Sequence, residues 1–305
     1  MRPGWTGGVT RGRLLLTRAI GSEHAAAIAA CTSLDDGIRV VAGSAYGERV
    51  QAGLDLGAAQ RGVAETLLWH LRILAGWLPA AGAGLMRTLA GWFELANIDA
   101  RLAALVSNGR EPAPFVLGGL ATGWNAIERA RTVEEVADAV ARSGWGDPGG
   151  RTPAAVTLGL RVAWARRVDE AAPGAADWVA GAGALLVARE LLVAGSREHL
   201  AQLQRLPAIG EEPLRAGSVE ELRAGLPSRA AWALSGLSEA DDLWQGELGW
   251  WDRVERDAHA LLPARSDEAV VLATVALLAV DAERTFRALQ AAAHGRRADL
   301  AGAGR

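Results

Sequence analysis

The chain has 305 residues, of which 50% are hydrophobic and 22% charged, with a formal net charge of −3. This balance is typical of a folded globular protein and excludes an intrinsically disordered one. All of the positive charge is arginine, because the sequence contains no lysine. A Walker A lysine and a Schiff-base lysine are therefore excluded. The slightly negative charge also disfavours nucleic acid as a partner.

The N-terminal region and the cysteine content predict a cytoplasmic protein. Near the N-terminus a run of three leucines is flanked by arginines, which is too short for a signal peptide. Cys31 is the only cysteine, so no intramolecular disulfide can form, as is typical of a reducing compartment. The longest apolar runs, 178–188 and 269–280, are shorter than the roughly 20 residues that span a bilayer. Any membrane association is expected to be peripheral.

The first third of the chain predicts short helices followed by a long helical pair. Residues 11–20 predict a helix that Gly21 ends, and a second helix is expected to run from Ser22 to Cys31. Leucines at spacings of three and four predict a long helix over 57–78, ended by Pro79. A second long helix is expected over 84–106, antiparallel to the first because the connection is short. A polar stripe with Arg87, Glu94, Asn97 and Arg101 is expected to adjoin its apolar seam.

The remaining two thirds repeat this pattern of short helices and long ones. Asn108 and Gly109 are expected to end the helix before them, and the proline-rich run 109–115 is the best candidate boundary. A short helix is predicted to follow Gly118–Leu120 and run to Ala130, and another to begin the stretch 132–145. Further helices are predicted over 153–171, 175–194, 218–226 and 243–262, and from Ser266 onward. Gly195 is placed as a C-cap. The last helix is expected to direct Asp281, Arg284 and Arg287 outward. No strand pattern is found, so the protein is predicted to be all-α.

Three segments share one sequence pattern, and the chain is best organised around them. They are 33–46, 132–145 and 218–232, and each opens with Ser or Thr followed by two acids. In each, a carboxylate lies three positions after the hydroxyl, which is a capping box: the hydroxyl accepts from the first helical turn and the carboxylate reaches back to the cap's own N–H. An aromatic residue follows each helix, at Tyr46, Trp145 or Trp232. We therefore predict three related helical units, over 1–110, 111–200 and 201–305, each with short capped helices and a longer hairpin.

A search for chemistry finds no catalytic, cofactor-binding or metal-binding residue. The five histidines, at 24, 70, 199, 259 and 294, lack partners at metal-ligand spacing. His70 and His259 are interpreted as packed or solvent-tipped side chains, and Cys31 as a small buried hydrophobe. Gly181 and Gly183 lack the third glycine and the preceding strand of a dinucleotide loop, so they indicate close helix packing. Most of the twelve tryptophans are interpreted as core anchors and a minority as interface hot spots. The sequence alone assigns no partner-binding positions.

The stretch 85–145 resembles a known family. The motif Glu94-x-x-Asn97-Ile98, the following Gly118-Gly119-Leu120 and the capped helix that starts at Thr132 are similar to the rotor adaptor of V-type and A-type ATPases. That family comprises the C-type subunit of archaeal and bacterial enzymes and the d-type subunit of vacuolar ones. The clear match covers about a fifth of the chain, and this chain has Trp145 where the family commonly has tyrosine.

The resemblance implies a function as well as a fold. It implies an all-helical, funnel-like, three-lobed molecule without a catalytic site or cofactor, at the cytoplasmic end of the membrane proteolipid ring. Its implied role is to couple the ring to the central stalk of an ATPase that transports protons or sodium ions. An alternative from another class is a soluble helical scaffold or regulator that binds a peptide or small ligand in a Trp-rich groove. A third, an enzyme with an unrecognised site, would need a polar cluster assembled from distant residues.

Overall fold

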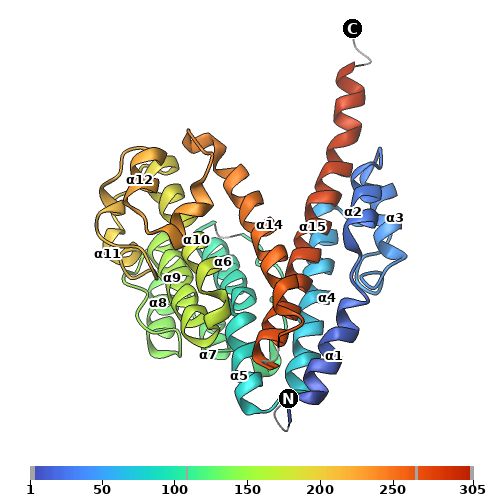
Figure 1. Cartoon of the computed structure of the whole chain (residues 1–305), viewed down its shortest axis with the longest axis horizontal. Helices are drawn as coiled ribbons and strands as arrows, with labels where there is room; N and C mark the ends of the chain where they lie inside the picture. Colours follow the sequence, from blue (N-terminus) through green and yellow to red (C-terminus); the bar gives the residue numbers. More distant parts are fainter. Residues whose placement is uncertain (1–3, 108, 265–266, 303–305) are drawn as a thin grey trace. The chain divides into compact units, whose positions relative to one another are not determined.

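The computed structural model describes residues 4–107, 109–264 and 267–302, and every regular element in these ranges is a helix (Figure 1). The prediction of an all-α protein is confirmed. Of the described helices, none combines the length and the apolar character needed to cross a bilayer. Asn108 and Ser266, where one helix was predicted to end and another to begin, lie outside the described residues.

The chain divides into two compact units, of which the first combines both ends of the chain. It comprises Met1–Gly82 and Asp257–Arg305. Its helices are α1 (Thr6–Leu16), α2 (Gly21–Ala29), α3 (Leu34–Ala42), α4 (Leu56–Gly76) and α15 (Asp267–Gly302). The four N-terminal helices all pack against α15, which supplies a long apolar seam including Val271, Leu278 and Leu289. The first unit is thus built around the last helix of the sequence.

The second unit, Ala83–Arg256, is continuous in sequence. It contains most of α5 (Ala80–Leu89) and α14 (Leu243–Leu261), together with the longer helices α6 (Gly91–Ser107), α9 (Pro153–Ala171) and α10 (Ala176–Ala188). Its shorter α-helices are α7 (Trp124–Ile127), α8 (Val133–Arg142), α11 (Leu200–Leu203), α12 (Val219–Gly225) and α13 (Ser228–Ala231). Single turns complete it: η1 (Gly118–Leu120), η2 (Pro173–Ala175), η4 (Pro213–Arg215), η5 (Trp232–Leu234) and η6 (Ala240–Asp242), with the π-helical η3 (Arg189–Val193).

Four predicted helices differ from the observed ones. The helix expected to follow Gly118–Leu120 and run to Ala130 is only the short α7, which ends at Ile127. The helix expected over 84–106 is two helices, because the chain turns at Ala90. There the indole Nε1–H of Trp164 donates to the Thr88 carbonyl at 2.8 Å, and the rings of Trp145 and Trp164 crowd Gly91. The helix expected over 175–194 changes to a π-helix after Ala188 and ends, as predicted, at Gly195, whose φ is 61°. The first helix ends at Leu16, and Gly21 begins α2 instead of ending α1.

The three predicted capping boxes are confirmed at their hydroxyls and corrected at their carboxylates. Ser33, Thr132 and Ser218 each accept a hydrogen bond of 3.2 Å from the backbone N–H three residues on. The carboxylates of Glu135 and Glu221, however, accept from the residue before the cap, at 2.6 and 2.8 Å. In the first copy, where the acid is aspartate, the Ser33 hydroxyl donates to Asp36 itself. Aspartate is one methylene too short to reach back along the chain.

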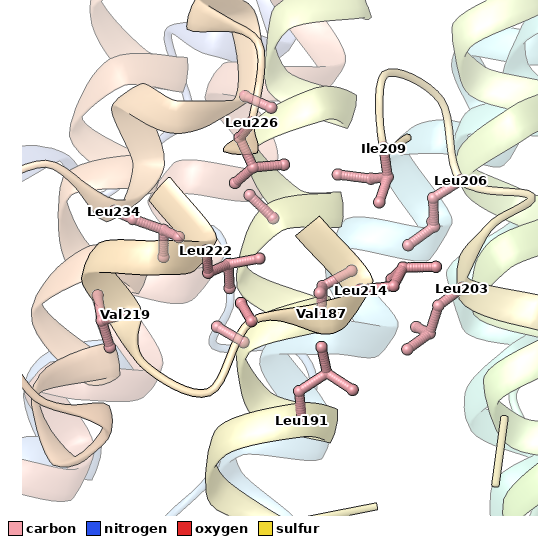
Figure 2. Packing of buried hydrophobic residues seen from close by; sticks show 14 of the residues in the cluster. Val187, Leu191, Leu203, Leu206, Ile209, Leu214, Val219, Leu222, Leu226 and Leu234 are labelled. Carbon is pink, nitrogen blue, oxygen red and sulfur yellow. The ribbon is translucent and has the colours of Figure 1, made fainter. Parts of the chain in front are cut away.

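The irregular segment 194–217 is held by apolar packing and by side chains that bind its backbone. Figure 2 shows leucines of this segment pointing toward Val187 of α10 and Leu191 of η3, and toward α12. Burial of each leucine side chain contributes about 1.5–3 kcal/mol. Gln202 donates to the Ala155 carbonyl at 2.9 Å, and Arg197 donates to the Leu214 and Ala216 carbonyls. These side chains replace the hydrogen bonds that a regular helix would provide.

Candidate functional site

The most organised polar cluster in the second unit surrounds Glu94, in the first turn of α6. This side chain is completely buried. Its Oε2 accepts from the Thr122 N–H at 2.6 Å, and its Oε1 accepts from the Gly123 N–H at 2.6 Å and from the Trp145 indole at 2.9 Å. Three N–H donors thus compensate the buried carboxylate, as a buried charge requires. Glu94 ties the start of α7 to the aromatic residue that follows the capped helix α8.

Two further side chains on successive turns of α6 extend this cluster. The Asn97 amide binds the Phe115 backbone twice, donating to its carbonyl at 3.0 Å and accepting from its N–H at 2.7 Å. Arg101 donates to the Ala130 carbonyl at 3.1 Å through Nε and pairs with Glu111. The stripe predicted on this helix is therefore not a solvated face. It anchors the irregular segment between α6 and α8.

An equivalent cluster surrounds Asp281 on α15 in the first unit. Asp281 is 3% exposed, so the prediction that it points outward is wrong. Its carboxylate accepts from the Ile20 and Gly21 N–H groups at 3.0 and 2.8 Å, and from the Tyr46 hydroxyl at 2.8 Å. As with Glu94, one acid on a long helix joins a helix start to the aromatic residue after a capping-box helix. The correspondence links Tyr46 with Trp145.

The third capping-box helix, α12, is followed by the same type of ring but lacks the acid. Gly181 of α10 lies against the Trp232 ring, as Gly91 of α6 lies against Trp145. Three residues after Gly181, where α6 carries Glu94, α10 carries the fully buried Ala184. The Trp232 indole donates instead to the Arg229 carbonyl at 2.9 Å.

Arginines cover the same two rings. The guanidinium of Arg167 lies 4.9 Å from the centre of Trp145, and that of Arg253 lies 4.7 Å from the centre of Trp232. These are cation–π contacts, worth about 0.5–1 kcal/mol where they are solvent-accessible. The third cluster therefore has the glycine, the ring and the arginine, but lacks the carboxylate.

The Asp281 cluster alters the titration of its neighbours. Burial raises the pKa of Tyr46 well above its ordinary value, and the negative charge of Asp281 raises it further. Burial lowers the pKa of His70 to about 4, and the positive charges of Arg18 and Arg11 act in the same direction, whereas Asp281 opposes them. His70 is therefore neutral in the folded protein at neutral pH.

A surface cleft of about 390 Å³ adjoins the Glu94 cluster. It lies between the segment 121–126, which includes the first three residues of α7, and the end of α8. Its polar lining includes Thr122, Asn125 and Arg142, and Arg142 and Asn125 are exposed. The same backbone segment that lines the cleft is held from behind by Glu94.

The structure does not bring the predicted candidate residues together. His24, His259 and His294 are exposed, His199 is half-buried and His70 is 3% exposed. Within the described ranges, no three His, Cys, Asp or Glu side chains lie where they could share a metal ion. Cys31 is half-buried, so its interpretation as a buried side chain is wrong: it follows the end of α2, where its thiol lies 3.3 Å from the Ala27 carbonyl.

The packing interpretation is confirmed for Gly181. A Cβ on Gly181 would meet the Trp232 ring at 2.4 Å, so this glycine serves helix packing. Of the tryptophans, most of which were interpreted as core anchors, four are buried: Trp5, Trp124, Trp145 and Trp178. All twelve tryptophans lie in the described ranges, and all except Trp77 and Trp244 are buried or half-buried. Sequence reasoning missed Asp281, although one signal marked it. It directly follows the apolar run 269–280, whose side chains are mostly buried.

The described side chains of these clusters hold the fold in place by hydrogen bonding. Each carboxylate accepts hydrogen bonds from fixed donors, which orients backbone and rings around the end of a helix. In sequence comparisons, the chain matches no protein-family model and no curated protein.

Proposed function

We propose that this protein is a non-catalytic rotor subunit of a V-type or A-type ATPase. In this role it couples the central stalk to the membrane proteolipid ring, at the cytoplasmic face of the membrane and without a cofactor. The transport of protons or sodium ions belongs to the complex as a whole.

One observation carries the proposal. The motif residues on which the family resemblance depends lie in one cluster: Glu94 and Asn97 on α6 bind the backbone on either side of Gly118–Leu120, and Glu94 also binds Trp145. A fortuitous likeness would have no reason to place these segments in mutual contact. A torque-transmitting part needs such fixed connections, because a loosely held helix start would yield under load.

The second support is the repetition of the cluster around Tyr46, Trp145 and Trp232. The shared contacts favour three related helical units, over 1–110, 111–200 and 201–305, and a funnel-like, three-lobed arrangement is the form that we propose for them. The cluster around Trp232 differs from the other two in having Ala184 where they have an acid.

The test is the composition and coupling of the ATPase in the native membrane. We expect the purified complex to contain this chain together with the stalk and ring subunits, as identified by mass spectrometry. Deletion of the gene should abolish ATP-driven ion pumping in membrane vesicles, and re-expression should restore it. ATP hydrolysis by the detached soluble part should continue, because the catalytic sites lie elsewhere. An intact, coupled rotor that lacks this chain would refute the proposal.

The second candidate function is that of a helical scaffold that binds a peptide or small ligand. The cleft beside α7 favours it, since its volume of about 390 Å³ is in the range of small ligand sites. Only one tryptophan, the buried Trp124, lines this cleft, so it is not a Trp-rich groove. Normal ion pumping in the deletion strain, together with ligand binding that Arg142→Ala abolishes, would favour this candidate over the first.

A further inference from the structure

Two of the most exposed apolar side chains of the second unit lie on neighbouring elements. Trp244, in the first turn of α14, is 59% exposed, and Val193, the last residue of the π-helical η3, is 58% exposed. The indole N–H of Trp244 has no hydrogen-bond partner among the described residues. Tryptophan with an exposed ring and a free N–H is the side chain most enriched at the centres of protein interfaces.

The contacts between the two elements place these side chains on the same surface. Segment η3 packs against η6, and Arg189 of η3 forms an ion pair with Glu247 of α14. Val193 lies one turn after Arg189, and Trp244 lies one turn before Glu247. Residues Trp250 and Arg253, further along α14, contact Trp178 and Asp177 at the start of α10, so α14 runs antiparallel to α10 and η3. One turn forward from Arg189 and one turn back from Glu247 therefore lead in the same direction. Trp244 and Val193 thus form one apolar patch, bordered on one side by the Arg189–Glu247 pair.

The charges around this patch are predominantly negative. Glu239 and Asp241 are exposed just before Trp244, and Asp242 and Glu190 are half-exposed. Arg189 is already paired with Glu247, and no ion pair involves Glu239, Asp241 or Asp242 among the described residues. The acids at 241 and 242 also suit the positive end of the α14 dipole. The interaction of these acids with the helix dipole does not explain why the Trp244 ring beside them is exposed.

We propose that the patch of Trp244 and Val193 binds a cationic amphipathic segment of a partner protein, in which arginine or lysine flanks apolar residues at helical spacing. The apolar residues cover Trp244 and Val193, while the cations meet Glu239 and Asp241 or stack on the indole. The acidic border argues against docking on an anionic lipid surface, which it would repel. This inference rests on the patch itself and does not depend on the rotor proposal.

The test uses the full chain and a defined probe, a fluorescently labelled amphipathic helical peptide of leucine and arginine. Fluorescence anisotropy should show saturable binding that weakens as salt increases, because the rim contacts are exposed charges. Trp244→Ala should weaken binding at least about tenfold, the usual effect of removing an interface hot spot. Asp241→Arg combined with Glu239→Arg should also weaken it.

Trp77→Ala is the matched control, since Trp77 is 58% exposed in the first unit. It should leave peptide binding unchanged, and a peptide with glutamate in place of arginine should not bind. Circular dichroism should show both tryptophan variants folded, because each ring is mainly in solvent. Any of four results would overturn the proposal. Two concern the peptide: Trp244→Ala binds it as tightly as the wild type, or both tryptophan variants lose the same affinity. The other two concern other occupants: Trp244-dependent binding to phosphatidylglycerol vesicles, or a dimer of this chain that Trp244→Ala abolishes.

Discussion

At the scale of single residues, the cap of α8 offers the simplest test. The Thr132 hydroxyl accepts from the Glu135 N–H at 3.2 Å, so Thr132→Ala leaves that donor without its partner. We expect the free energy of unfolding to fall by about 1 kcal/mol, the usual effect of losing a helix cap. Urea denaturation measures it. Ser218→Ala should cause a similar loss, whereas Ser22→Ala, at an exposed position of α2, should cause almost none.

Substitution of Glu94 should destabilise the protein much more than substitution of an exposed glutamate. In Glu94→Gln one carboxylate oxygen becomes an NH₂ group. Whichever way the amide is turned, this NH₂ faces a backbone N–H donor, because Thr122 and Gly123 bind different oxygens of Glu94. We expect a loss of roughly 2–4 kcal/mol, from a charge-assisted hydrogen bond and an unpaired donor. Urea denaturation monitored by circular dichroism measures this loss.

The control is Glu134→Gln, an exposed acid in the first turn of α8, which should change stability by less than about 0.5 kcal/mol. Equal stability of Glu94→Gln and the wild type would mean that the buried carboxylate contributes no net stability.

His70 should make the protein less stable in mild acid. In the folded state its pKa is lowered to about 4, whereas an unfolded chain protonates near pH 6.5. Between these values the unfolded state binds more protons, so the free energy of unfolding falls as the pH falls. From pH 6.5 to 5 the loss from His70 should be roughly 2 kcal/mol. Across this window, the urea midpoint should depend less steeply on pH in His70→Gln than in the wild type. In His24→Gln, where the substituted ring is exposed, the midpoint should vary with pH as in the wild type.

At the scale of elements, close approach between helices and rings sets the tolerance of two glycines. Both Gly181 and Gly249 lie inside helices, but a Cβ at 181 would meet the Trp232 ring at 2.4 Å, while one at 249 meets nothing. Gly181→Ala should therefore destabilise by about 1–3 kcal/mol through overpacking. Gly249→Ala should stabilise by up to about 1 kcal/mol through helix propensity. Thermal melts of both variants measure the contrast, and a stabilised Gly181→Ala would mean that the ring moves aside freely.

Local sequence signals predicted the elements where they were complete in themselves. Helix α9 has the expected bounds because Thr152 caps it and Pro153 starts it. The three capping boxes could likewise be recognised because their residues are neighbours in the sequence. Gly195 ended its helix as predicted. Each of these signals acts within a few residues of its position.

Signals that depend on distant residues could not be read in advance. The turn at Ala90 requires the indole of Trp164, and the start of α2 requires Asp281, which is 260 residues away from Gly21. The periodicity of α6 showed that Glu94 and Asn97 share a stripe. It could not show that an irregular segment would cover that stripe. The candidate site was therefore visible as residues but not as a cluster.

At the scale of the whole molecule, the two units should differ in their ability to fold as fragments. Ala83–Arg256 is continuous and has its own apolar cluster, so we expect it to fold alone. Residues 1–82 lack α15, which all four of their helices contact, and should stay largely unfolded alone. Circular dichroism and amide exchange of the two fragments measure this. The N-terminal fragment should gain protection when α15 is fused to it by a flexible linker; protection without α15 would contradict the expectation.

The place of α15 has a consequence for how the protein is made. The first four helices leave the ribosome early, but their common partner is translated roughly 190 residues later, which takes roughly 10–40 s at ordinary elongation rates. During that interval their apolar faces have no native partner within reach, while the second unit can already fold behind them. The N-terminal helices are thus the first to emerge and the last to settle, which makes them the natural clients of chaperones on the nascent chain.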